Sequence, residues 1–141
     1  MIVLEPVVEH ELVPGERVLG HYQAQIARLT GTGWAASLPP LYATVTNARL
    51  LLKPQTRRPY DPASIPGRQI SRVQSLVLGR RSAVTIALRD GLHINLFIPG
   101  RQSELFVADM QRMLFPSPRT RFTAHVPAYD IHRLIDAIAQ R

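Results

Sequence analysis

The residue types that most often carry enzymatic chemistry are sparse in this chain and poorly spaced for it. The sequence contains five histidines, His10, His21, His93, His125 and His132. No two of them stand at i and i+4, and no Asp or Glu accompanies them at the spacing of a metal-binding motif. The chain has no cysteine, which excludes a thiolate metal site, a cysteine nucleophile and a disulfide. The sequence therefore predicts a non-enzymatic protein with no catalytic residue, metal site or cofactor.

Arginine is the residue type that could bind a ligand. The sequence holds 17 basic residues, all arginine except Lys53, and has a net charge of +7. A guanidinium group stays charged at physiological pH and binds phosphate or carboxylate through two parallel hydrogen bonds. We interpret the densest basic group as an anionic-ligand surface. It consists of Lys53, Arg57, Arg58, Arg68, Arg72, Arg80 and Arg81.

The partner of this basic group stays open at the level of sequence. Anionic membrane lipid and an acidic protein surface both suit it, and so does a solvated rim without a ligand. Nucleic acid is less favoured, because base stacking needs aromatic residues among the arginines and Tyr60 is the one nearby. The acidic partner could include the chain's own N-terminal lead, residues 1–13, which carries Glu5, Glu9 and Glu11 and no Lys or Arg.

Two groups of apolar residues could act as interface anchors. Trp34, the one tryptophan, stands near Leu38 in a segment rich in glycine and proline. It could anchor a membrane or protein partner, or pack under a loop that folds back. Near the C-terminus, one helical face is formed by Ile131, Leu134, Ile135 and Ile138. This stripe must be covered by the chain's own sheet or by a neighbouring subunit.

The elements that would position these residues are mostly strands, because apolar residues alternate over most of the chain. Pro, Gly and Asn residues separate the strands, and Asp90-Gly91 is a strong hairpin signal. We predict strands at 17–29, 41–46, 49–53, 63–65, 69–78, 82–89 and 92–98, a positive φ at the turn of Asn47, and a long loop at 30–40.

Two helices follow the predicted strands. Phe106, Met110, Met113 and Leu114 have helical spacing and predict a helix over 101–114, which Pro116 and Pro118 end. A short extended piece at 121–126 then leads to the second helix, with Pro127 in its first turn. Neither a signal peptide nor a membrane span is evident, so we expect a soluble cytoplasmic protein, peripheral at the membrane if it binds lipid.

Three short motifs in a fixed order resemble a known family. They are Pro14-Gly15-Glu16, the segment Thr46-Asn47-Ala48-Arg49-Leu50 within 41–52, and Ile70-Ser71-Arg72-Val73. Together with the closing helix, they make residues 12–114 similar to PH-like domains, above all to GRAM and bacterial PH-like domains. The resemblance implies a bent sandwich of about seven antiparallel strands, closed by the helix at 101–114.

The sequence thus predicts a mainly β, PH/GRAM-like domain over 1–116 and an extension over 117–141 that packs on the same domain. Its expected function is that of an interaction or assembly module, with an unidentified protein partner or self-association. Peripheral binding to anionic lipid through the basic loops is the alternative, and nucleic-acid binding is a second one.

Overall fold

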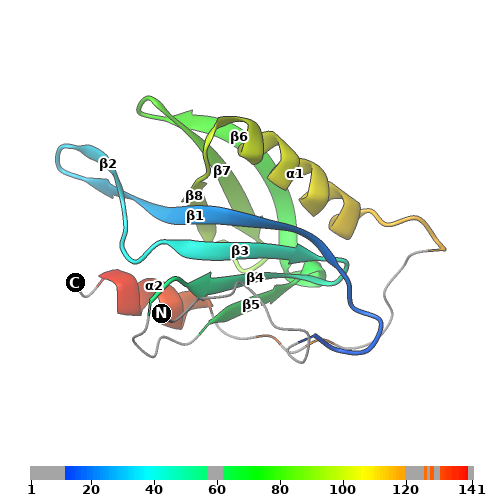
Figure 1. The fold of residues 1–141 in the computed structure, drawn as a ribbon. Coiled ribbons are helices and arrows are strands. Elements are labelled where there is room, and N and C mark those ends of the chain that lie inside the picture. Colours follow the sequence, from blue (N-terminus) through cyan, green and yellow to red (C-terminus); the bar gives the residue numbers. More distant parts are fainter. Residues whose placement is uncertain (1–11, 57–61, 120–125, 127, 129–130, 140–141) are drawn as a thin grey trace, which may run out of the picture.

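The computed structural model describes residues 12–56, 62–119, 126, 128 and 131–139, and shows an antiparallel sheet accompanied by two α-helices (Figure 1). This confirms the predicted mainly β fold. The strands are β1 (Val18–Thr30), β2 (Gly33–Ala36), β3 (Leu41–Thr46), β4 (Arg49–Pro54), β5 (Ala63–Pro66), β6 (Ile70–Leu78), β7 (Arg81–Leu88) and β8 (His93–Phe97). The helices are the 3₁₀ helix η2 (Gly67–Gln69), α1 (Gly100–Leu114) and α2 (Ile131–Ala139).

The long strand β1 joins the two halves of the sheet. The strands lie in the order β5-β4-β3-β1-β8-β7-β6, and β2 pairs with β1 outside this path. Residues of β1 pair first with β3, then with β8 through Gln25 and Ile26, and finally with β2. In the described residues β5 and β6 are the two ends of this order and do not pair, so the sheet bends without closing into a barrel.

Helix α1 covers the core, as predicted for residues 101–114. Phe106, Met110 and Met113 are buried among side chains from both halves of the sheet. The Phe106 ring meets Tyr22 of β1 edge to face, with 5.3 Å between ring centroids, and the Tyr22 hydroxyl donates to Asp109. Burial of side chains of this size contributes about 1.5–3 kcal/mol each, so α1 is an integral part of the fold.

The segment predicted as a loop at 30–40 contains a strand, β2, which the prediction missed. Thr30 Oγ1 donates to the Gly33 carbonyl oxygen at 2.7 Å, and Gly33 has a φ of +125°, which favours glycine. This tight turn returns the chain along β1, where Trp34 pairs with Leu29. The glycines of this segment predicted the turn correctly, but they also led to the prediction of a loop where the short strand β2 follows the turn.

The hairpin turns differ in one respect from the prediction. Gly91 has a φ of +98°, as expected for the Asp90-Gly91 turn. At Asn47 the predicted positive φ is wrong, because no described non-glycine residue has one. The Asn47 side chain instead forms hydrogen bonds that hold residues 15–17 in place.

Helix α2 lies against β5, at the lower left of Figure 1. Ile131 and Leu134 are buried in the main core, and Ile135 packs against it. His132 Nε2 lies 3.5 Å from a carboxylate oxygen of Asp90, at the β7–β8 turn. The Ile138 side chain, the extended piece at 121–125 and Pro127 lie outside the described residues.

Candidate functional site

A buried ion pair joins two of the motifs that resemble GRAM domains, Pro14-Gly15-Glu16 and the segment 46–50. Glu16 follows the turn before β1, and Arg49 begins β4. Arg49 Nε and Nη2 donate to the two carboxylate oxygens of Glu16 at 2.8 and 3.0 Å, and Nη1 donates to Ser64 Oγ. The exposed fractions of the two charged side chains are 3% and 0%. A pair so completely buried and so well bonded supports the fold and is closed to ligands.

The Glu16 carboxylate is held ionised by its neighbours. Burial by itself raises the pKa of Glu16, but hydrogen bonds from Arg49, Thr46 and the Val13 amide outweigh burial and lower it below its ordinary value. Thr46 Oγ1 lies 2.7 Å from Glu16 Oε2 and also accepts the Arg49 amide. The Thr-Asn-x-Arg motif is therefore a structural device, with threonine and arginine both directed at one carboxylate.

Asn47 fixes the same segment from its other side. Its Oδ1 accepts the Arg17 amide at 2.8 Å, and its Nδ2 donates to the Gly15 carbonyl oxygen at 3.2 Å. These bonds hold the start of β1 against the β3–β4 turn. Arg17 is thereby placed at the surface beside the end of α1.

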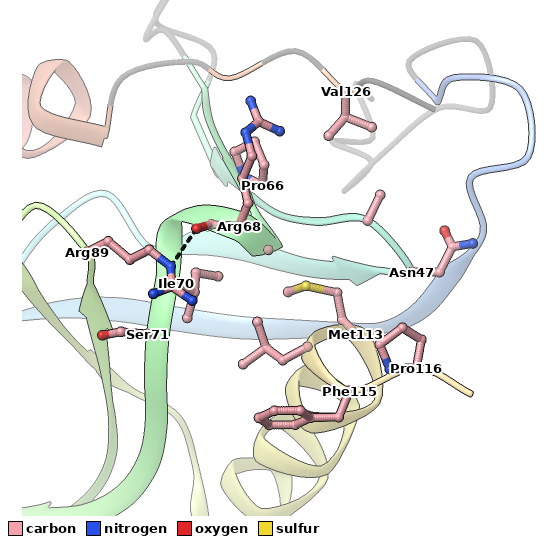
Figure 2. A pocket seen from close by; sticks show the side chains of 13 residues that line it. Asn47, Pro66, Arg68, Ile70, Ser71, Arg89, Met113, Phe115, Pro116 and Val126 are labelled. Carbon is pink, nitrogen blue, oxygen red and sulfur yellow. Dashed lines mark hydrogen bonds between the residues drawn. The ribbon is translucent and has the colours of Figure 1, made fainter. Parts of the chain in front are cut away.

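Two grooves lie on either side of the end of α1, and we call them together the Phe115 site. The larger has a volume of about 510 Å³ and lies between α1 and the corner formed by η2 and β6 (Figure 2). Arg68 and Arg89 line it together with Ile70, Met113 and Leu114. Arg89 is held in position because its Nε donates to the Arg68 carbonyl oxygen at 2.8 Å, the dashed line in Figure 2.

The smaller groove has a volume of about 300 Å³ and is lined by Arg17, Leu19 and Arg112. Asn47, Phe115 and Pro116 line both grooves. Phe115 is 76% exposed, and its amide donates to Gln111 at 2.8 Å as the last hydrogen bond of α1. An exposed aromatic ring thus stands between two concave surfaces.

The Phe115 site is strongly cationic. Four arginines line the two grooves, and no carboxylate is among the described lining residues. Arg112 pairs with Asp109 at 3.1 Å. Within the described part of the chain, no carboxylate pairs with Arg17, Arg68 or Arg89. Unpaired guanidinium groups beside apolar walls suit an anionic ligand that also has apolar groups.

The predicted anionic-ligand residues do not form one cluster. Arg68 lies at the Phe115 site and Arg72 is exposed nearby on β6, whereas Arg80 and Arg81 lie at the far end of β6, about 20 Å along the strand from Arg72. Lys53 is half-buried on β4. Arg57 and Arg58 lie outside the described residues. The Arg81 guanidinium stacks over the Phe97 ring at 4.0 Å from its centroid.

The predicted interface anchors lie in different surroundings. Trp34 is half-buried and packs against a small second cluster that includes Phe97 and Leu78, on the side of the sheet away from the main core. Leu38 is 59% exposed. Ile131 and Leu134 are covered by the chain's own sheet.

Sequence reasoning missed Arg17, Arg89, Arg112 and Phe115 as members of a site. In the sequence, Phe115 stands beyond the last apolar position of the helix and directly before Pro116, which reads as a helix stop. Three of the arginines come from separate segments, near residues 17, 89 and 112, and only the fold brings them together.

The described residues offer little else for chemistry. In the ranges that the structure describes, no three His, Asp or Glu side chains gather as metal ligands. His21 Nδ1 lies 2.9 Å from Thr44 Oγ1, and burial lowers the pKa of this imidazole. None of the described helices is long and apolar enough to cross a bilayer.

Comparison with known proteins gives little further information. No family model matches the chain, and no curated protein matches it. Among solved structures, the C-terminal domain of an unknown protein from Leishmania infantum is similar, with a TM-score of 0.48 and 18% identity. The match covers 71% of this chain and 86% of that one. A likeness of this degree carries no argument about function.

Proposed function

We propose that this chain is a non-enzymatic, PH/GRAM-like interaction module that binds an acidic segment of a partner protein at the Phe115 site. One observation carries the proposal: two adjoining grooves share an exposed aromatic ring, four arginines line them, and none of their described lining residues is acidic. Acidic side chains would pair with the arginines, and apolar side chains would cover Phe115 and the end of α1.

The strand order supports the PH-like part of the proposal. When β2 is set aside, the order β5-β4-β3-β1-β8-β7-β6 is a seven-stranded antiparallel arrangement with α1 over its core. The resemblance of Pro14-Gly15-Glu16 and Thr46-Asn47-x-Arg49 to GRAM motifs gains a physical reason, because Glu16, Thr46 and Arg49 form one buried network.

Anionic membrane lipid is a second candidate at the same site. Phe115 is 76% exposed beside arginines, an arrangement that would let the ring enter a bilayer interface while the guanidinium groups meet phosphates. We favour the protein segment because the arginines lie along concave grooves on both sides of the ring. In either case the module would act without catalysis.

A binding experiment separates these candidates. The probe is a fluorescein-labelled ten-residue peptide of alternating glutamate and valine, measured by anisotropy, beside the matching lysine-valine peptide. We expect binding of the acidic peptide alone, weakened by salt because exposed charges are screened over about 8 Å at physiological ionic strength.

Two alanine variants test whether the acidic peptide binds at the Phe115 site. Arg89→Ala should weaken acidic-peptide binding, whereas Arg28→Ala removes the same charge from an exposed position on β1 and should leave it unchanged. Equal affinity in both variants would refute the Phe115 site. Co-sedimentation with phosphatidylserine vesicles, lost in Arg89→Ala without any peptide binding, would establish the lipid candidate instead.

A further inference from the structure

Strand β6 forms one end of the sheet. It pairs with β7 on one side, and among the residues that the structure describes no strand pairs with its other side, since β6 is the last strand in the order. Helix α1 runs beside β6 (Figure 1). The Phe115 site lies at the end of the strand where Ile70 is, since Ile70 lines its larger groove. An unpaired strand edge is a template for an additional strand unless something covers it.

The pairing with β7 determines which backbone groups of β6 face outward. Gly79 and Arg80 form a two-residue turn, so its flanking pair, Leu78 and Arg81, exchanges hydrogen bonds. Every second residue then repeats this arrangement, because the register is continuous from Arg72 to Leu78. The backbone groups of Leu76 and Gln74 therefore face β7, and those of Val73, Ser75 and Val77 face away from it.

An independent contact supports this alternation. Gln111 of α1 donates through Nε2 to the Val73 carbonyl oxygen at 3.4 Å, from the side away from β7. At Val73 the edge is thus partly occupied by the chain itself. Ser75 and Val77 are the next two residues with outward-facing backbone.

The edge opens into a groove at these two residues. A groove of about 430 Å³ is lined on one side by Ser75, Leu76 and Val77 of β6 with the neighbouring Ser82 of β7, and on the other by the first turn of α1, with Arg101 and Glu104. Val77 is 67% exposed. Ser75 and Val77, whose backbone groups face away from β7, therefore border an open groove.

Charge at the two ends of β6 indicates what kind of chain would fit. Arg80, Arg81 and Arg101 lie where β6 ends, and Arg68, Arg72 and Arg89 lie where it begins. Among the described residues lining the grooves at the two ends, Glu104 is the one acidic side chain. A segment with acidic residues toward both ends would be attracted along the whole strand.

We propose that the acidic partner segment binds in an extended conformation and adds to β6 as a further strand, with its backbone bonded to Ser75 and Val77. This inference rests on the proposed function and specifies the binding mode. A second copy of this chain is a poorer occupant, because antiparallel pairing of two β6 edges would bring Arg72 toward Arg80 and Arg81 of the other copy.

Val77→Pro tests the proposal on the protein. Proline removes the outward-facing amide of Val77 and costs no hydrogen bond to β7, a placement that edge strands tolerate. We expect the acidic glutamate-valine peptide to bind Val77→Pro about three- to tenfold more weakly than wild type, the effect of one lost hydrogen bond. Val77→Ala, which keeps the amide, is the matched control and should retain most of the affinity.

Amide hydrogen exchange of the wild-type protein gives a second readout that needs no variant to fold. Strand addition should slow exchange at Ser75 and Val77 by at least about tenfold when the acidic peptide is bound at saturation. The lysine-valine peptide should leave both rates unchanged.

Three outcomes would overturn the proposal in distinguishable ways. If the peptide binds and requires Arg89, but exchange at Ser75 and Val77 is unchanged, strand addition is wrong and the proposed function stands. If no acidic peptide binds, the proposed function fails and strand addition fails with it. If the wild type sediments as a dimer and Val77→Pro as a monomer, the occupant is a second copy rather than an acidic segment.

Discussion

Arg49, the first residue of β4, and Arg89, in the turn after β7, carry the same guanidinium group, yet their surroundings are opposite. Arg49 is buried and directs its nitrogens at Glu16 and Ser64. Arg89 is exposed, is steadied by the Arg68 carbonyl oxygen, and has no carboxylate partner among the described residues. Arginine in this basic chain thus occurs in two kinds of surroundings, one inside the fold beside a carboxylate and one on the exposed surface.

The largest effect is expected where the buried role is removed. Arg49→Ala leaves the Glu16 carboxylate in the interior without its cation, a change that costs about 3–5 kcal/mol of unfolding free energy. Urea unfolding followed by circular dichroism would measure it. A loss below about 1 kcal/mol would show that Glu16 finds water or another partner, and that the ion pair is not what holds β1 to β4.

A double substitution would show whether that loss of stability comes from the unpaired Glu16 carboxylate. Glu16→Leu combined with Arg49→Met replaces the pair with apolar groups of similar size, and such exchanges are often neutral or stabilising. We expect the double variant to regain at least about 2 kcal/mol relative to Arg49→Ala. If the double variant is as unstable as the single one, the hydrogen bonds to Thr46 and Ser64 are what the fold requires.

Acid should weaken the buried region through Glu16. The folded-state pKa of Glu16 lies below its ordinary value of 4.5, so the unfolded chain takes up this proton first as the pH falls. The contribution of Glu16 to stability is therefore fully present above pH 4.5 and is lost as the pH falls through the lower folded-state pKa. Unfolding free energies of wild type and Glu16→Gln between pH 7 and pH 3 should converge at the acidic end, and parallel curves would contradict this assignment.

The smallest effect on stability is expected at the Phe115 site. Arg68→Ala with Arg89→Ala, and separately Phe115→Ser, remove exposed side chains and should change the unfolding free energy by no more than about 0.5 kcal/mol per substitution. Thermal melting of each variant beside Arg28→Ala would measure this. A large loss would mean that these residues, like Arg49, serve the fold, and the contrast between the two regions would disappear.

The regular spacing of apolar residues along the sequence was sufficient to predict most of the fold. Alternation in segments such as 82–89 and helical spacing from Phe106 to Leu114 gave the seven strands of the main path and α1 to within one or two residues. These are local properties, since burial on one face of a strand or helix imposes its own period. Strand β2 was missed because its four residues are too few to show a period after the turn at Gly33.

Only the tertiary structure decided which polar residues meet. Glu16 lies 33 residues from Arg49 in the sequence and 2.8 Å from it in the fold, and no periodicity connects them. The same holds for Arg17, Arg89 and Arg112, which come together around Phe115 because β1, β7 and α1 converge there. The local density of basic residues in the sequence instead predicted that Arg68 and Arg81 belong to one surface, whereas they lie at opposite ends of β6. The sequence by itself determines the strands and helices, because each buries one face locally. The sites depend on strand pairing between distant segments, because that pairing sets which side chains become neighbours.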